Sequence, residues 1–503
     1  MATARLTIDP RFTVGPVNRR LFGSFVEHLG RCVYDGIYEP GHPTADAQGF
    51  RQDVADLVVE LGVSAIRYPG GNFVSGFNWE DSVGPQAERP RRLDLAWHST
   101  ETNQVGLHEF SSWLDKVGSE LMLAVNLGTR GTAEALELLE YSNLPSGTAR
   151  ADQRAANGKA EPFNVRMWCL GNEMDGPWQL GHRSAEDYGK LAAQTATAMR
   201  QLDPGLELVV CGSSSAHMPT FGEWERVVLT HTYDSVDYIS CHAYYQEKDG
   251  DLGSFLASST DMDHFIRSVV ATADHVKAVR GSARTINISF DEWNVWYIDR
   301  YEQVDKISGI DNWPVAPRLL EDVYSVADAV VFASLLMTLV NHADRVTSAS
   351  LAQLVNVIAP IMTEPGGPAW RQTTFFPFAK ISQLARGSAL AVRVESGTYE
   401  SAAYGTVRLV EAAATHDEAT GELAVFLVNR SQTEEMQVTV DVSGAGDLTV
   451  ADAVTLHDAD IHAGNTLADP ERVGLQPNTT ATANGNTVLV ILPPVSWTAL
   501  SLR

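Results

Sequence analysis

Cysteine and positive charge are both scarce in this chain. Only four of its 503 residues are cysteines, and no two of them have CxxC spacing. This excludes a disulfide framework, does not indicate zinc and predicts reduced thiols. Lys and Arg number 37 against 63 Asp and Glu, for a formal net charge of -26. Such a charge repels phosphate backbones and anionic lipids, so we expect no nucleic-acid or membrane partner, whereas neutral substrates stay open.

Long hydrophobic runs and a leader-like start are also missing. The longest uncharged apolar stretch, AVVFASLLMTLV, covers 329–340, whereas a membrane helix needs about 20 apolar residues. We therefore expect a buried core helix there. The first residues, MATARLTIDPRFTVGP, contain no apolar segment behind a basic start. The sequence accordingly predicts a cytoplasmic protein.

What the chain does contain is a series of short apolar runs that end in polar residues. They are near-continuous rather than alternating, which is typical of parallel strands buried on both faces. The runs cover 21–28, 63–71, 120–128, 164–173, 206–214, 236–245, 284–293 and 345–353.

Between these runs lie stretches with helical spacing of apolar residues, at 53–62, 108–118, 184–203 and 265–281. Eight strands alternating with helices predict an α/β fold, a (β/α)8 TIM barrel. A doubly wound open sheet is the structural alternative, but no GxGxxG follows the first strand. The polar segment 146–162 is expected to be a loop-rich insertion.

The pattern changes after about residue 386. Short alternating runs at 421–430, 435–442 and 486–503 are separated by Asn, Thr and Gly, which predicts an antiparallel β-sandwich domain. We expect a catalytic barrel over 16–387 and a sandwich over 388–503. The strand candidate at 4–10 has no helix after it, so residues 1–15 are expected to join the sandwich.

Catalytic groups in such a barrel stand at the carboxyl ends of the strands. There the sequence places carboxylates, amides and aromatic residues, and no single strand end offers a cluster of three His or carboxylate ligands. PGGN (69–72) lacks the spacing and the lysine of a phosphate loop, so it predicts a tight turn that presents Asn72. The polar residues at these strand ends are Glu27, His28, Arg67, Asn72, Asn172, Glu173, His242, Tyr244, Glu292 and Gln353.

Glu173 and Glu292 form the candidate catalytic pair. Two carboxylates from opposite sides of a barrel can flank a glycosidic bond, one as acid/base and the other as nucleophile. A salt bridge at the barrel rim is the alternative role for either one. Asn172 beside Glu173 can bind a sugar 2-hydroxyl. Aromatic side chains stack on sugars, and four of them fall in strand-end loops: Trp97, Trp178, Trp293 and Trp296.

These residues lie in stretches that resemble the α-L-arabinofuranosidases of glycoside hydrolase family 51. The matching stretches run in order along nearly the whole chain: FGSFVEHLGRCVYDGIYEP (22–40), IRYPGGNFVSGFNWEDSVGP (66–85), ETNQVGLHEF (101–110), FNVRMWCLGNEMDGPWQLGH (163–182), FDEWNVWY (290–297) and AQLVNVIAPI (352–361).

The resemblance implies a retaining enzyme with Glu173 as acid/base and Glu292 as nucleophile. It also implies a pocket for a terminal arabinofuranosyl unit, lined by Glu27, Arg67, Asn72, Asn172, Tyr244 and Gln353, with Trp97 and Trp296 as aromatic walls. His242-Ala243-Tyr244-Tyr245 departs from the pattern, so Tyr245 is the alternative to Tyr244.

The resemblance further implies a neutral oligosaccharide substrate from arabinan or arabinoxylan, no cofactor or metal, action inside the cell, and a homo-oligomer, with the hexamer as the family's usual form. Two other functions are compatible with the same residues. The same machinery could cut a β-xyloside or β-glucan, because pocket shape decides the sugar. A carbohydrate-binding protein with a degenerate site is the second, although both carboxylates and Asn172 are present.

Overall fold

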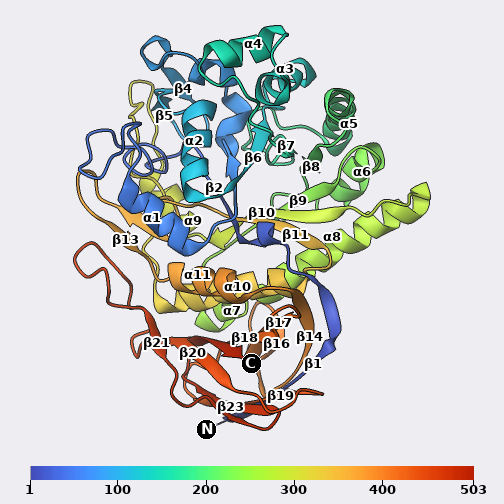
Figure 1. The fold of residues 1–503 in the computed structure, drawn as a ribbon, viewed down its shortest axis with the longest axis vertical. Coiled ribbons are helices and arrows are strands. Elements are labelled where there is room, and N and C mark those ends of the chain that lie inside the picture. The colour runs from blue at the N-terminus through green and yellow to red at the C-terminus, as the bar shows by residue number, and fades with distance from the viewer. Residues whose placement is uncertain (1) are drawn as a thin grey trace.

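The predicted barrel is confirmed. The computed structural model describes residues 2–503, and eight parallel strands form a closed barrel in its upper part (Figure 1). Each strand coincides with one of the eight apolar runs. They are β2 (Gly23–Phe25), β3 (Ala65–Tyr68), β6 (Glu120–Val125), β7 (Met167–Leu170), β8 (Glu207–Val210), β9 (Tyr238–Tyr245), β10 (Asn287–Val295) and β11 (Val346–Leu351).

Helices surround the barrel strands, and most of them bury apolar residues against the strands. The hydrophobic cluster of the barrel contains residues from strands and helices alike, as expected for a packed barrel core. The helices are α1 (Gln52–Leu61), α2 (Leu107–Val117), α3 (Thr132–Asn143), α4 (Ala149–Ala156), α5 (Ala185–Leu202), α6 (Glu223–Thr232), α7 (Leu252–Leu256), α8 (Ser259–Arg280), α9 (Ile298–Arg300), α10 (Val326–Asn341) and α11 (Phe375–Leu384).

Helix α10 is the apolar stretch that the sequence predicts as a core helix. All of its residues except Asn341 are buried. It lies with α11 between the barrel and the C-terminal sheet (Figure 1), so it has no face in contact with solvent. Among residues 2–503, no helix is both long enough and apolar enough to cross a membrane.

The segment 146–162 differs from its prediction as a loop-rich insertion, because it contains helix α4. Arg154 is fully buried on this helix. Its guanidinium donates to four backbone carbonyls, so four of its five N–H groups have partners. Those contacts, which polar composition alone does not reveal, stabilise the helix. The four carbonyls belong to Tyr141, Leu144, Lys159 and Ala160.

The C-terminal region forms a ten-stranded sheet, antiparallel except for one pair, that encloses its own apolar core. In spatial order its strands are β21 (Leu475–Pro477), β20 (Val450–Leu456), β24 (Ser496–Leu502), β18 (Glu422–Asn429), β17 (Val410–Asp417), β14 (Ser388–Glu395), β1 (Ala2–Pro16), β19 (Met436–Val442), β23 (Thr487–Leu492) and β22 (Thr482–Asn484).

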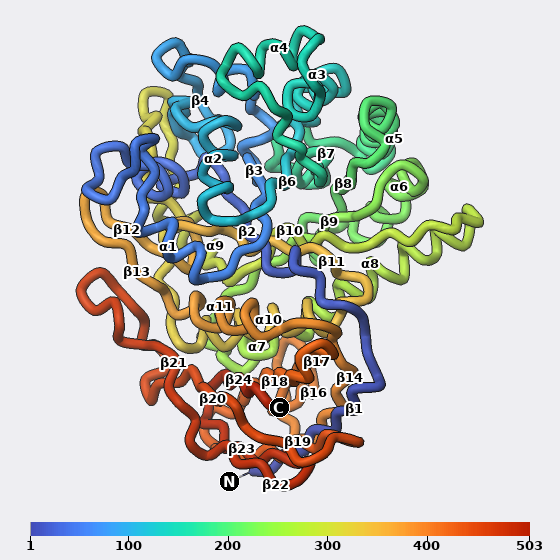
Figure 2. The backbone as a smooth tube through the Cα atoms, viewed as in Figure 1, coloured from blue at the N-terminus to red at the C-terminus, as the bar shows by residue number. Residues whose placement is uncertain are grey.

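Strand β1 lies in the middle of this sheet, although it comes first in the chain. It pairs antiparallel with β14 and parallel with β19, and Figure 2 shows the blue N-terminal segment running among the orange and red strands. This is the pairing that the sequence predicts for residues 1–15. The division of the chain into two folding units at 387/388 stays a prediction.

Leu6 is expected to contribute strongly to the stability of this sheet. It is fully buried in the sheet's core, and truncation of such a leucine leaves a cavity. Leu6→Ala should therefore lower the free energy of unfolding by about 2 to 5 kcal/mol, measured by urea denaturation followed by circular dichroism. Thr3 is on the solvent side of the same strand. Thr3→Ala should therefore change the free energy of unfolding by less than about 0.5 kcal/mol. Equal effects of both would contradict the core position of Leu6.

Candidate active site

Polar side chains, most of them buried, gather at the carboxyl end of the barrel. Glu27 follows β2, Arg67 lies on β3, Glu173 follows β7, and Tyr244 and Glu292 lie on β9 and β10. All of these strands are parallel, so their carboxyl ends face the same opening. The turn PGGN presents Asn72 there. Gly71 has φ +61, and a Cβ at that position would lie 2.2 Å from the Glu27 carboxyl group, so the turn requires glycine.

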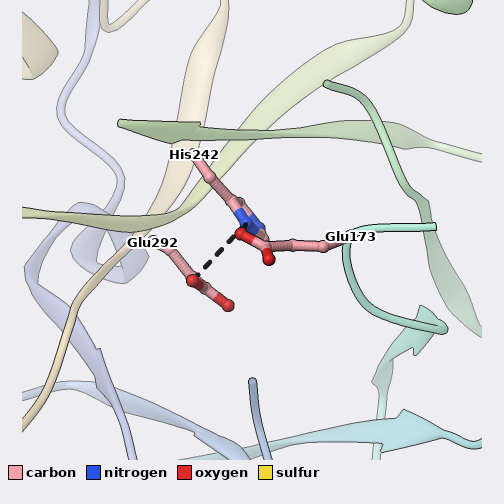
Figure 3. A group of neighbouring side chains, drawn as sticks. All are labelled: Glu173, His242 and Glu292. Carbon is pink, nitrogen blue, oxygen red and sulfur yellow. Dashed lines mark hydrogen bonds and ion pairs between the residues drawn. The ribbon is translucent and has the colours of Figure 1, made fainter. Parts of the chain in front are cut away.

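Glu173 and Glu292 lie side by side across the opening, with His242 between them (Figure 3). The two residues are 8% and 4% exposed, and they offer carboxylate oxygens within 4.8 Å of each other. Glu173 has φ +43, an uncommon left-handed conformation for a non-glycine residue. The chain turns sharply directly after β7, which directs this carboxylate into the opening.

Glu292 has three donors around its carboxylate. Arg67 Nη1 donates to Oε1 at 2.9 Å and the Tyr244 hydroxyl donates to Oε2 at 2.7 Å, while His242 Nδ1 lies 3.5 Å from Oε2. Burial raises the pKa of Glu292 above its usual range, and the charges of His242 and Arg67 act in the opposite direction. The hydrogen bonds from Arg67 and Tyr244 favour the ionised form, which is the form that a nucleophile needs.

Glu173 is contacted from two sides. His242 Nδ1 lies 2.9 Å from Oε1, and Trp178 Nε1 donates to Oε2 at 2.7 Å. The Trp178 side chain is otherwise largely open to solvent, since the residue is 54% exposed. Glu173 therefore lies between the buried cluster and the solvent-facing rim, where a leaving group can be reached.

A chain of hydrogen bonds connects the carboxylate pair to the PGGN turn. Arg67 Nη2 donates to Asn172 Oδ1 at 2.6 Å, and Asn172 Nδ2 donates to Asn72 Oδ1 at 3.2 Å. Asn172 is thus held between Arg67 and Asn72, directly beside Glu173 in sequence. Both amides are oriented by partners, as required for side chains that recognise sugar hydroxyls.

Glu27 forms the other side of the site. Its Oε1 accepts from Trp97 Nε1 at 2.7 Å and from the Phe73 backbone N–H at 2.9 Å, and its Oε2 accepts from Gln353 Nε2 at 3.1 Å. Burial raises the pKa of Glu27 well above its usual range, while the bond from Trp97 lowers it. The structure therefore brings Glu27, Trp97 and Gln353 together, and their role in lining a sugar pocket stays a prediction.

Tyr244 and Tyr245 point in different directions. Tyr244 contacts Glu292, and its ring packs edge-on against Trp296 with centroids 5.1 Å apart. The Tyr245 hydroxyl instead donates to Asp261 Oδ2 at 3.0 Å. Of the two candidates, Tyr244 is the one that reaches the carboxylate pair.

Three further residues of this cluster are not predicted from the sequence as site residues. In the sequence, His242 is only a polar residue at a strand end and Trp178 is only one of four tryptophans in strand-end loops. Asp291 has no signal beyond its position beside Glu292. His242 Nε2 lies 3.0 Å from Asp291 Oδ1. The pairing of β9 with β10 is what brings these side chains together.

One group of side chains has the spacing of a metal site. Among residues 2–503, only Glu173, His242 and Glu292 place three donor atoms within 4.8 Å of one another. Both ring nitrogens of His242 already face carboxylates, so the arrangement is that of an ion-pair cluster rather than an open coordination site. The expectation of catalysis without metal or organic cofactor stays a prediction.

Comparison with known proteins identifies the family. The Alpha-L-arabinofuranosidase 1 domain matches residues 57–267, and the Alpha-L-arabinofuranosidase C-terminal domain matches residues 291–496. An exo-α-(1→6)-L-arabinofuranosidase of Bifidobacterium longum is 60% identical over 99% of this chain and 97% of its own length. The chain belongs to the family 51 α-L-arabinofuranosidases.

Two further proteins place this arabinofuranosidase within the family. An intracellular exo-α-(1→5)-L-arabinofuranosidase of Streptomyces lividans is 61% identical over 99% of this chain and 75% of its own length. The solved structure of a family 51 α-L-arabinofuranosidase from Bifidobacterium longum superimposes with a TM-score of 0.96 at 51% identity and covers all of both chains. This arabinofuranosidase is thus a glycoside hydrolase, as its sequence predicts, and the rival interpretation as a carbohydrate-binding protein is not supported.

Proposed function

We propose that this arabinofuranosidase releases non-reducing terminal α-L-arabinofuranosyl residues from neutral oligosaccharides with net retention at the anomeric carbon. The observation that carries retention is the short separation of the two carboxylates, whose oxygens lie within 4.8 Å. Retaining enzymes place their carboxyl groups about 5 to 5.5 Å apart, whereas inverting enzymes need roughly 6.5 to 9.5 Å to admit a water molecule.

In the first step, Glu292 is the nucleophile and Glu173 the acid. A Glu292 carboxylate oxygen attacks the anomeric carbon, and the bond to the leaving oxygen breaks as that oxygen takes the proton of Glu173. Arg67 and Tyr244 orient Glu292 through the bonds at 2.9 and 2.7 Å. Glu173 faces the rim, where the leaving sugar departs.

In the second step, Glu173 acts as a base. It removes a proton from water, the water oxygen attacks the anomeric carbon, and the ester bond to Glu292 breaks. Arabinose leaves with the configuration of the substrate because each step inverts the anomeric carbon. Glu173 ends protonated and Glu292 ends ionised, ready for the next cycle.

The remaining side chains are proposed to recognise the sugar. Asn172 is placed to bind the 2-hydroxyl, a contact that strengthens as positive charge develops on the ring. Glu27 and Gln353 offer hydrogen-bonding groups on the opposite side of the site, and Trp97 and Trp296 offer apolar walls. The set is mainly of side chains that bind hydroxyl groups, which suits a neutral sugar.

We further propose that the enzyme works in the cytoplasm on fragments of arabinan or arabinoxylan. Relatives from Streptomyces lividans and Halalkalibacterium halodurans, at 61% and 50% identity, are named intracellular. Assembly into a homo-oligomer, with a hexamer as the expected form, stays a prediction that sedimentation velocity can test.

The test of the proposed function is a rate comparison on 4-nitrophenyl glycosides. We expect a strong preference for the α-L-arabinofuranoside over the β-D-xylopyranoside and the β-D-glucopyranoside. The configuration of the first-formed arabinose, followed by NMR, should match that of the substrate. A preferred pyranoside would overturn the substrate assignment, and an inverted product would overturn the retaining mechanism.

A further inference from the structure

A bulge in strand β10 brings two adjacent carboxylates to one imidazole. Ser289 pairs with Ser240 and Glu292 pairs with His242, so β10 has one residue more than β9 across this interval. Neighbouring residues on a regular strand point to opposite faces, but the extra residue changes that alternation. Asp291 and Glu292 consequently both reach His242, at 3.0 Å from Nε2 and 3.5 Å from Nδ1 respectively.

The contacts of His242 require a proton on each ring nitrogen. Nδ1 faces Glu173 at 2.9 Å as well as Glu292, while Nε2 faces Asp291. A neutral imidazole has only one N–H, so one nitrogen would present a lone pair to a carboxylate oxygen. Burial lowers the pKa of His242, but the charge of Glu292 and the hydrogen bonds to Asp291 and Glu173 outweigh that effect and raise the pKa to about 10. The imidazolium therefore persists until the pH rises through that value.

Charge moves between the two carboxyl groups that share His242 Nδ1. In the proposed first step Glu292 loses its negative charge as it forms the ester, and Glu173 gains one as it gives up its proton. The second step reverses both changes. Glu292 has Arg67 as a further cationic partner at 2.9 Å, whereas among residues 2–503 the only charged partner of Glu173 is His242.

We propose that His242 is a positioning residue whose imidazolium, held by Asp291, balances the negative charge that passes from Glu292 to Glu173 in the first step and returns in the second. This inference rests on the proposed function. Because Nδ1 faces both carboxyl groups, the cation need not move when the charge does. Such preorganised charge is an efficient way to stabilise a transition state.

The other ionisable groups around this cluster leave that assignment intact. Arg67 Nε lies 3.9 Å from Asp291 Oδ2, so Asp291 has cations on two sides. Asp175, two residues after Glu173, accepts from the Ser214 backbone and hydroxyl, and burial raises its pKa to about 6. Burial also raises the pKa of the Cys169 thiol, which contacts Asp291 at 3.8 Å and stays neutral.

The test is the pH profile of two variants, with kcat/KM measured on an arabinose-containing oligosaccharide. In Asp291→Asn, His242 loses a carboxylate partner and gives up its proton at lower pH, so the alkaline limb should move to lower pH by about one unit or more. In His242→Gln, no imidazolium faces the two carboxyl groups at any pH. The alkaline limb that follows His242 should then be absent, with kcat/KM lowered by roughly 10²-fold.

A matched control comes from another His–Asp pair, outside the barrel opening. His342 Nε2 lies 2.7 Å from Asp263 Oδ1, so His342→Gln removes the same type of contact and should leave the pH profile unchanged. The double variant of His242→Gln and Asp291→Asn should be no slower than His242→Gln, because Asp291 acts through His242. Thermal unfolding of each variant shows whether it is folded.

The outcomes separate this inference from the proposed function. If the wild type is inactive on the arabinofuranosyl substrate, the proposed function fails first. If the wild type is active but both folded variants lose rate equally at every pH, the cluster has only a structural role and the inference is overturned. An alkaline limb that moves to lower pH in Asp291→Asn and is absent from His242→Gln supports it, since a general loss of packing does not produce that result.

Discussion

Glu292→Ala is expected to lower kcat on 4-nitrophenyl α-L-arabinofuranoside by roughly 10⁴-fold or more, the size of effect seen when a member of a covalent-catalysis triad is removed. Without the carboxylate, no ester can form at the anomeric carbon, and a good leaving group does not compensate for a missing nucleophile. Steady-state rates of the purified variant beside the wild type would measure the loss.

Glu207 supplies the control for this prediction. It also lies on a barrel strand, but at the amino end, where it pairs with Arg20 at 2.6 Å. Residues at that end of a barrel stabilise the fold rather than act in catalysis. Glu207→Ala should therefore lower the melting temperature with little change in kcat at 25 °C. Substantial turnover by Glu292→Ala would show that the nucleophile is another residue.

Glu173→Ala is expected to separate substrates by their leaving groups. An oligosaccharide needs a proton on the departing oxygen, so its kcat/KM should fall by roughly 10² to 10⁴-fold. A 4-nitrophenolate departs without one, and kcat/KM for the aryl substrate should fall much less. Equal losses on both substrates would contradict the acid role of Glu173.

The same variant should respond to added azide. The glycosyl-enzyme forms from the aryl substrate and then persists, because no base activates water. Azide needs no base, so it should attack the anomeric carbon, raise kcat and give a glycosyl azide with the configuration of the substrate. The wild type should show no such rise. An azide product of inverted configuration would mean that Glu292 is not involved in a covalent intermediate.

The barrel was predictable because burial of parallel strands leaves a local pattern in the sequence. Each of the eight apolar runs becomes a barrel strand, and the apolar stretch 329–340 lies in the buried helix α10. Because parallel strands end at one side of a barrel, the strand-end residues Glu27, Arg67, Glu173 and Glu292 could be grouped without coordinates. Strand β1 also followed, since a strand without a succeeding helix does not fit the βα alternation.

The side chains that contact these strand-end residues are set by the register between the barrel strands. His242 and Asp291 are 49 residues apart and meet because β10 carries one extra residue opposite β9. Helix α4 likewise depends on contacts outside the helix, because backbone carbonyls of other segments accept hydrogen bonds from the buried Arg154 side chain. Neither leaves a periodic signal in its own segment.

Local patterns along the chain are enough to locate the strands and helices of the barrel, the end at which it opens, and two glutamates at that opening. The physical reason is that burial and backbone geometry impose their periods on adjacent residues. Three contacts follow from the tertiary fold alone. Tyr244 rather than Tyr245 reaches Glu292, and Trp178 contacts Glu173. His242 faces three carboxylates. Those contacts arise from register and barrel closure, which join residues distant in the chain and are set by the packing of the whole fold.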